Sequence, residues 1–444
     1  MSEKLEQSRR TFLKTAAAAG AALTADALLP QVHAAGSDTI QVGLVGCGGR
    51  GTGACHDVLR AAENVKIVAL GDVFSGQVQG ARGTLQGIVK RDKDVKKGNT
   101  VEVPDERCYV GLDAYKKVIN CPDVNYVILA TPPGFRPLHI EETVTAGKNL
   151  FTEKPVGTDG PGIRQVLAAY EVAQKKGLKI AAGTQRRHQG GYIETIKRIH
   201  DGAIGDPVLL RAYWDQGDLW FRDRSDLNGR PEKPTELAYQ LWNWYQFCWI
   251  CGDHIVEQHV HNLDVANWVM KNEHPVRAWG QGSRIGGRKL RPTGDPKDVG
   301  NIFDNFTVEF EYPNGTRMIS QCRQIGGCWN SVSEAVHGTK GTSQVNSYRI
   351  GKETVVRPGQ ERPYEQEHTD LIAAIRGGKD LNELKTVAES TMTAILGREA
   401  SYAGQEVTWD RALGMRRLMD TANLRWDADV PVSPAPVAGR YKVV

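Results

Sequence analysis

A carboxylate and a histidine in this 444-residue sequence have the spacing that acid–base chemistry on a hydroxyl group requires. Glu257 and His261 are four residues apart, so a regular helix would place them on one face, which Asp264 continues. A carboxylate beside an imidazole favours the protonated ring and fixes its orientation, which suits a general base for a hydroxyl proton. The alternative interpretation is a structural polar helix start.

A lysine could complete this chemistry. Lys154 lies in Glu153-Lys154-Pro155, directly after an expected strand at Asn149 to Phe151. Open α/β sheets place their chemistry at the carboxyl ends of strands, where a lysine can orient a hydroxyl and ease its deprotonation. The alternative, one solvated lysine among many, stays open on spacing alone.

A glycine-rich turn predicts a nucleotide cofactor. Gly46, Gly48, Gly49, Arg50 and Gly51 follow an apolar strand and open an expected helix at Thr52 to Ala62. Such glycines let the backbone turn tightly and approach a pyrophosphate, which the helix amino terminus then binds. The alternative is a glycine-rich turn without a ligand.

Asp72 lies 21 residues past Gly51, at the end of the second expected strand. A carboxylate there binds ribose hydroxyls and repels the extra phosphate of NADP, so we expect NAD, with NADP the less favoured cofactor. The ends of two later strands should also contact the cofactor, through Thr131, Pro132, Glu153 and Lys154.

The elements that must position these residues follow two different sequence patterns. Strands and helices alternate to about residue 185, which predicts an α/β domain with a doubly wound parallel sheet, a loop at 131–134 and a surface excursion at 86–108. After about residue 190, alternating runs predict an α+β domain with a large, mostly antiparallel open sheet. Two helices stand out, at Glu257 to Met270 and Thr386 to Tyr402.

The amino terminus has the pattern of a twin-arginine signal peptide over residues 1–36. SRRTFLK precedes an apolar segment at Ala16 to Leu29, and Val32-His33-Ala34 suits cleavage. The apolar segment is interrupted by Asp26 and ends at Pro30, so it is too short for a membrane span and we expect no stable membrane insertion. The pattern predicts export to the periplasm by the twin-arginine machinery, which carries folded proteins.

Composition gives no reason to expect a nucleic-acid partner and favours a packing role for most of the cysteines. The net charge of +4 gives no argument for binding nucleic acid. Most of the eight cysteines are expected to be buried free thiols. Cys248-Trp249-Ile250-Cys251 lies in an aromatic run without a thioredoxin-like unit, so packing is favoured over redox chemistry.

Taken together, these segments resemble the Gfo/Idh/MocA oxidoreductase family. The resemblance rests on VGLVGCGGRG, on the stretch from DVNYVILATPP to FTEKP, on GDHIVEQHVHNLD, and on the block from HTDLIAAIRGG to QEVTWD. It implies a Rossmann domain at 37–187 and a substrate and oligomerisation domain at 188–444, with homo-oligomers formed on the open sheet. By resemblance Lys154 is the active-site lysine and His261 the catalytic histidine, while Glu257 stands where many members have aspartate.

Substrate contacts are expected from Arg186 and Arg187, which follow the last strand of the first domain, and from Tyr192 and His259. The alternative for the two arginines is a solvated basic turn. His259 departs from the family, which often has glycine there. A divalent metal held by His259 together with Glu257 and His261 is the alternative. Residues two apart on a regular helix diverge by about 200°, so no metal is expected.

The resemblance implies an exported NAD-dependent oxidoreductase that acts on a sugar, polyol or glycoside. One alternative is a glycosidase that oxidises its substrate transiently and returns the hydride at the end. Another is a sugar-binding relative without turnover. Because a nucleotide cannot be exchanged readily outside the cytoplasm, we expect the cofactor to be tightly bound in either enzyme.

Overall fold

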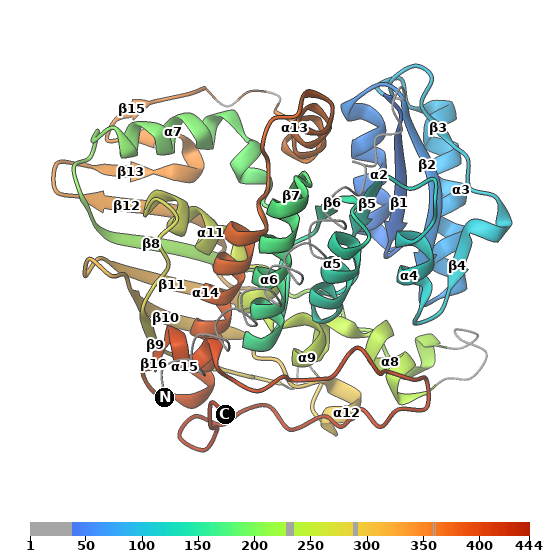
Figure 1. The fold of residues 1–444 in the computed structure, drawn as a ribbon. Coiled ribbons are helices and arrows are strands. Elements are labelled where there is room, and N and C mark those ends of the chain that lie inside the picture. The colour runs from blue at the N-terminus through green and yellow to red at the C-terminus, as the bar shows by residue number, and fades with distance from the viewer. Residues whose placement is uncertain (1–37, 228–234, 287–291, 358, 360) are drawn as a thin grey trace, which may run out of the picture. The chain divides into compact units, whose positions relative to one another are not determined.

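The first sheet is parallel and carries the glycine-rich turn. The computed structural model describes residues 38–227, 235–286, 292–357, 359 and 361–444, so the expected signal peptide lies outside the described residues. Seven strands form the sheet in the order β3-β2-β1-β5-β6-β7, with β4 beside β2 (Figure 1). The strands are β1 (Ile40–Val45), β2 (Val65–Asp72), β3 (Thr100–Val101), β4 (Cys108–Val110), β5 (Tyr126–Leu129), β6 (Asn149–Thr152) and β7 (Ile180–Ala182).

Helices join these parallel strands, as the alternating sequence predicts. They are α2 (Gly49–Ala61), α3 (Ser75–Arg91), α4 (Ala114–Ile119), α5 (Arg136–Thr145) and α6 (Gly160–Lys176). The expected surface excursion at 86–108 is wrong at its start, because helix α3 continues to Arg91. Its four glycines weaken the helical pattern in the sequence, but Val78, Ala81 and Leu85 bury one face against the sheet. The expected loop at 131–134 also differs, since Pro133–Phe135 form a 3₁₀ turn.

A helix from the second half of the chain completes the first layer. Helix α13 (Pro363–Gly377) buries Leu371 and Ile372 in the same apolar cluster as β1 and β2. The Nδ1 atom of His368 lies 2.7 Å from the hydroxyl oxygen of Tyr126 on β5. Residues far beyond 187 therefore help to build the nucleotide-binding layer.

The second sheet has nine strands in the order β15-β14-β13-β12-β8-β11-β10-β9-β16. Only β8 and β11 pair in parallel, which confirms the expected mostly antiparallel sheet. Alternate residues are buried along β10 and β11, because helices cover one face. The strands are β8 (Pro207–Gln216), β9 (Arg277–Ser283), β10 (Asn305–Glu311), β11 (Arg317–Gln324), β12 (Ser331–Gly338), β13 (Thr342–Gln344), β14 (Arg349–Ile350), β15 (Glu353–Thr354) and β16 (Val407–Thr408).

Helix α14 (Leu384–Ala403) is buried along nearly its whole length, between this second sheet and α6 (Figure 1). It corresponds to the helix expected at Thr386 to Tyr402 and has nearly the same bounds. In the described part of the chain, no helix has the length and apolarity needed to cross a bilayer.

The helix expected at Glu257 to Met270 is broken. The structure has a short helix, α10 (His254–Glu257), and then α11 (Val260–Val269). Between them the amide of His259 binds the carbonyl of His254, and the amide of His261 binds the carbonyl of Gln258 instead of that of Glu257. Glu257 and His261 are therefore not related by a regular helical turn, and the carbonyl of Glu257 is available to another donor.

Candidate active site

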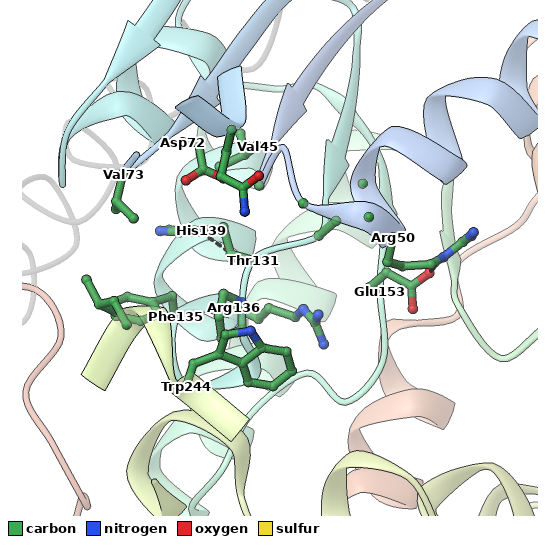
Figure 2. A pocket seen from close by; sticks show the side chains of 18 of the residues that line it. Val45, Arg50, Asp72, Val73, Thr131, Phe135, Arg136, His139, Glu153 and Trp244 are labelled. Carbon is green, nitrogen blue, oxygen red and sulfur yellow. Dashed lines mark hydrogen bonds and ion pairs between the residues drawn. The ribbon is translucent and has the colours of Figure 1, made fainter. Parts of the chain in front are cut away.

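A cavity of about 600 Å³ lies at the carboxyl ends of the parallel strands and extends to residues of the second half of the chain. All ten residues predicted to bind the cofactor line it, and so do Glu257 and His261. Figure 2 shows Asp72 and Val73 on one side of the cavity, Arg136 and Trp244 on another, and Arg50 beside Glu153. The structure therefore gathers the predicted cofactor and catalytic residues in one place.

The glycines of the turn fall into two pairs. Gly46 has a φ of +94°, and a Cβ there would lie 2.7 Å from the backbone of Thr131. A Cβ on Gly51 would lie 1.9 Å from the carbonyl oxygen of Gly46, so both positions need glycine to close the turn. A Cβ on Gly48 or Gly49 would meet no atom within 4 Å, so these two glycines leave space for a ligand above the start of α2.

Asp72 is held at this edge by main-chain amides. Its Oδ2 accepts a hydrogen bond from the amide of Cys47 at 2.8 Å, and its Oδ1 accepts one from the amide of Phe74 at 3.0 Å. Burial raises the pKa of the Asp72 carboxyl, while these amides oppose the rise. The carboxylate is thus fixed beside the glycine turn, where it can accept hydrogen bonds from ribose hydroxyls.

Aromatic rings surround the end of the cavity next to Asp72. His139 stacks on Tyr115 with ring centroids 4.1 Å apart, and its Nδ1 lies 3.1 Å from the hydroxyl of Thr131. Burial lowers the pKa of His139 to about 3, so this ring is neutral. Phe74 meets Trp242 of α8 (Glu236–Trp242) edge to face at 5.7 Å. This apolar end, which we call the adenosine end, suits a flat base.

Charged residues gather where β6 ends. Arg50 donates to Glu153 and lies 4.8 Å above the ring of Tyr364. Burial opposes ionisation of Glu153, but Arg50, together with Lys154 and Arg136, outweighs it and lowers the pKa of this carboxyl. Glu153 is therefore ionised and anchors Arg50 across the glycine turn.

Lys154 is fixed by Glu257 through two contacts. Its Nζ donates to the carbonyl oxygen of Glu257 at 2.7 Å and lies 3.1 Å from the carboxylate Oε2. The helix break supplies the carbonyl, because the amide of His261 bonds elsewhere. Burial raises the pKa of Glu257, and Lys154 opposes that rise. The ammonium group is thus oriented by main chain and side chain together.

His261 contacts a different partner from the one expected. Its ring stacks on Trp214 with centroids 5.5 Å apart, whereas the Glu257 carboxylate binds Lys154. Because the helix is broken between them, Glu257 and His261 lack the regular i, i+4 relation that would pair their side chains. Burial, and next the charge of Lys154, lower the pKa of His261 well below its usual value, so the imidazole is neutral and can accept a proton.

The four residues expected to contact the substrate are outside the lining of this cavity as described. Arg186 and Tyr192 both bind the buried carboxylate of Glu334, Tyr192 at 3.1 Å. Arg187 binds Asp264, and Nε and Nη2 each lie 2.9 Å from one of its carboxylate oxygens. These interactions compensate buried charges within the second half of the chain, which gives a structural reason for such residues.

His259 is fully buried, and its Nε2 lies 2.7 Å from the hydroxyl of Ser320 on β11. The ring is thus engaged with the second sheet rather than with Glu257 or His261. Among the residues that the structure describes, no three His, Cys, Asp or Glu side chains are grouped to hold a metal ion. All eight cysteines belong to the described residues and are free thiols, and Cys248 and Cys251 are buried.

Several residues that line the cavity were not predicted from the sequence. Arg136 at the start of α5 is 4% exposed and donates to the carbonyl of Pro155. Burial lowers its pKa to about 10. Trp214, Trp220 and Trp244 come from the part of the chain that follows the parallel sheet. Trp244 belongs to the aromatic run around Cys248 and Cys251, for which packing was expected, whereas Arg136 has no local pattern that marks it.

Comparison with known proteins places this geometry in a family. Residues 40–184 match the Gfo/Idh/MocA model described as an oxidoreductase family with an NAD-binding Rossmann fold, and residues 228–406 match the model of its C-terminal alpha/beta domain. Residues 6–25 match the twin-arginine translocation signal sequence.

Curated relatives include inositol 2-dehydrogenases from Agrobacterium fabrum and Gluconacetobacter diazotrophicus. The first is 22% identical over 63% of this chain and 65% of the relative. The second is 26% identical over 53% of this chain and 56% of the relative. The matched regions thus span less than two thirds of these relatives.

Solved structures with the same fold include scyllo-inositol dehydrogenase from Lactobacillus casei with bound NAD(H) and scyllo-inositol. It has a TM-score of 0.59 and 19% identity, and the match covers 84% of this chain and 99% of that one. GenD2 from gentamicin A biosynthesis, in complex with NAD, has a TM-score of 0.60 and 15% identity over 86% of this chain and 99% of its own. With both domain models matched in order and the NAD-binding turn in place, the chain belongs to the Gfo/Idh/MocA oxidoreductase family and carries a twin-arginine signal sequence.

Proposed function

We propose that the protein is an NAD-dependent oxidoreductase that transfers hydride between nicotinamide and the hydroxyl-bearing carbon of a sugar, polyol or glycoside. The observation that carries this proposal is the meeting of Lys154 and His261 in the cavity that contains the glycine turn. A neutral histidine beside an oriented ammonium group is the pair that oxidation of an alcohol needs. The same pair argues against a sugar-binding relative without turnover.

When bound, NAD supplies the hydride acceptor. Lys154 donates a hydrogen bond to the hydroxyl oxygen of the substrate and stabilises the negative charge that develops there. His261 accepts the hydroxyl proton at a ring nitrogen, since its lowered pKa keeps the ring neutral. Glu257 positions Lys154 through two contacts. In this proposal Glu257 therefore orients the lysine, whereas the sequence had suggested that it orients His261.

Tryptophans support a carbohydrate as the substrate. Trp214 stacks on His261, and Trp220 meets Trp244 edge to face at 5.6 Å, all three at the cavity. Indole rings offer broad apolar faces that pack against the C–H surfaces of a sugar ring. The inositol dehydrogenases among the relatives act on cyclic polyols, which supports the same class.

We propose that the mature protein acts in the periplasm, and the match of residues 6–25 to the twin-arginine signal sequence supports this. That route carries folded proteins, so the cofactor binds before export and has to be regenerated in place. A second substrate or a redox-neutral cycle would regenerate it.

The second candidate function is therefore an NAD-dependent glycosidase. Enclosure of the adenosine end by Phe74 and Trp242 favours it, because a retained cofactor suits a cycle that returns its hydride. Here the substrate is oxidised at a ring carbon, loses the aglycone by elimination, adds water and is reduced again.

A panel of polyols, sugars and aryl glycosides separates the two functions. An oxidoreductase accumulates NADH or reduces a second substrate, whereas the glycosidase releases the aglycone without added NAD and without net NADH. Absorbance at two wavelengths follows aglycone and NADH together. Absence of turnover on every class, in protein that contains NAD, would contradict both functions.

A further inference from the structure

The carboxyl-terminal residues from 407 onward lie beyond the region that matches the family's C-terminal domain model, which ends at 406. They contain β16 and α15 (Trp409–Leu413), and we call residues 414–432 the tail. In Figure 1 this red segment leaves α15, passes below α9 (Cys248–Cys251) and reaches α8. The tail therefore crosses from the second sheet to the helix that closes the adenosine end.

One apolar cluster joins the tail to the cavity. Val430 is fully buried in it, together with Phe74 and Trp242, which line the cavity. Further members pack against the cluster from the tail, namely Leu418, Met419, Leu424, Trp426, Ala428 and Val432. The tail is thus part of the same packing unit as the wall of the adenosine end.

A buried glutamine ties the tail to α8. The Nε2 of Gln240 donates to the carbonyl oxygen of Val430 at 2.7 Å, and its Oε1 accepts from the indole Nε1 of Trp249 at 2.7 Å. Gln240 is fully buried, so loss of its amide would leave both partners without water to replace it. Gln240 also lies two residues before Trp242.

The start of the tail is anchored on the parallel-sheet side. The amide of Leu418 donates to Oδ2 of Asp159 at 2.8 Å, and Oδ1 of the same carboxylate caps α6 through the amide of Gly162 at 2.7 Å. The tail therefore connects α6 to α8, with fixed points at Leu418 and Val430.

Helix α8 in turn closes the cavity. Leu241 and Trp242 both line it, and Trp242 packs on Phe74, whose amide holds Asp72. A nucleotide bound at Asp72 and the glycine turn would lie in the part of the cavity that Phe74 and Trp242 line. Movement of α8 would widen this end, and the tail resists that movement.

We propose that the tail is a retention element of the cofactor site: it holds α8 and Trp242 over the adenosine end and slows the release of NAD. This inference rests on the proposed NAD-dependent function. It assigns a cofactor-binding role to a segment that the family models do not cover.

The test measures the exchange of bound NAD for isotope-labelled NAD in the folded mature protein. Gln240→Leu removes the hydrogen bonds to Val430 and Trp249, together with one to Glu236 within α8, at nearly constant volume. It should speed release at least tenfold, which corresponds to about 1.4 kcal/mol. Val430→Ala removes apolar contact on the tail itself and should speed release in the same direction. Arg425→Ala is the matched control, because its side chain is 78% exposed and pairs with Asp427 of the same tail.

Circular dichroism and the midpoint of thermal unfolding verify that each variant is folded. Release as slow as in the wild type from both folded variants would overturn the retention role. An equal acceleration in Arg425→Ala would also overturn it. Wild-type protein that binds no NAD at all would instead overturn the proposed function, so the two failures are distinguishable.

Discussion

The two ends of the cavity are built in different ways. The adenosine end consists of a glycine turn, a carboxylate held by amides, and aromatic rings, with His139 kept neutral. The other end, which we call the reactive end, contains Lys154, Glu257 and His261. Its central contact is the ion pair between Lys154 and Glu257, 103 residues further along the chain. In the proposed function, shape would hold the cofactor at one end and charge would prepare the chemistry at the other. Substitutions should therefore separate binding from turnover.

The largest effect should come from the reactive end. Lys154→Met removes the only ammonium group that contacts Glu257 in the described structure and should lower kcat about 1,000-fold. The NAD content should stay unchanged, because the adenosine end is intact. Steady-state rates and the absorbance of released nucleotide measure the two quantities. Lys175→Met, at an exposed position on α6, is the control, and loss of NAD together with activity would refute the separation.

At the adenosine end, Asp72→Ala should weaken NAD binding by about 10- to 100-fold, since it removes charge-assisted hydrogen bonds to the ribose. It should weaken NADP less, because the repulsion of the extra phosphate disappears too. Titration of cofactor-stripped protein with each nucleotide tests this. A wild-type preference for NADP, or an equal loss for both nucleotides, would contradict the assigned role.

Glu257→Gln should have a smaller effect than loss of the lysine, about tenfold in kcat, because the main-chain carbonyl still holds Lys154. The rate of the wild type should fall in acid as the Glu257 carboxyl, whose pKa is raised, takes up a proton. The variant lacks this titration, so its profile should be flatter in acid. An unchanged acid limb would show that another group controls it.

The smallest effect concerns stability at the adenosine end. The folded protein keeps His139 neutral down to a pKa of about 3, whereas the unfolded chain protonates it near the usual 6.5. Unfolding thus takes up a proton between these values, and this site costs about 1.4 kcal/mol of stability per unit of falling pH. His139→Phe should make the free energy of unfolding less dependent on pH in this interval. Denaturant titrations of both proteins at pH 7 and pH 5 give the change in the free energy of unfolding between the two pH values. The same change in the wild type and in His139→Phe would disprove the assignment.

The sequence predicted what depends on local pattern. The glycine turn, Asp72 and Lys154 lie at the cavity, as predicted. They could be predicted because strands and turns have a recognisable periodicity and characteristic residue types. The twin-arginine prediction agrees with the matched signal sequence, and the family assignment is confirmed.

Features that depend on distant partners could not be predicted in this way. The break after Glu257 has no glycine or proline to mark it, and it arises where buried residues pack against the second sheet. Arg186 and Arg187 have the composition of a binding turn, yet carboxylates from later segments engage them. Helix α13 joins the first layer from 180 residues beyond it, and only tertiary packing reveals this.

The break between α10 and α11 also affects how this site can vary. The ammonium group of Lys154 donates one of its two hydrogen bonds to the main-chain carbonyl of residue 257. This contact depends on the path of the backbone, so any amino acid at position 257 can provide it. The side chain there can change in length or charge while the lysine keeps an acceptor. Substitution at position 257 can thus adjust the electrostatics around Lys154 without relocating the lysine, which makes this position a suitable starting point for engineering the pH range of the proposed activity.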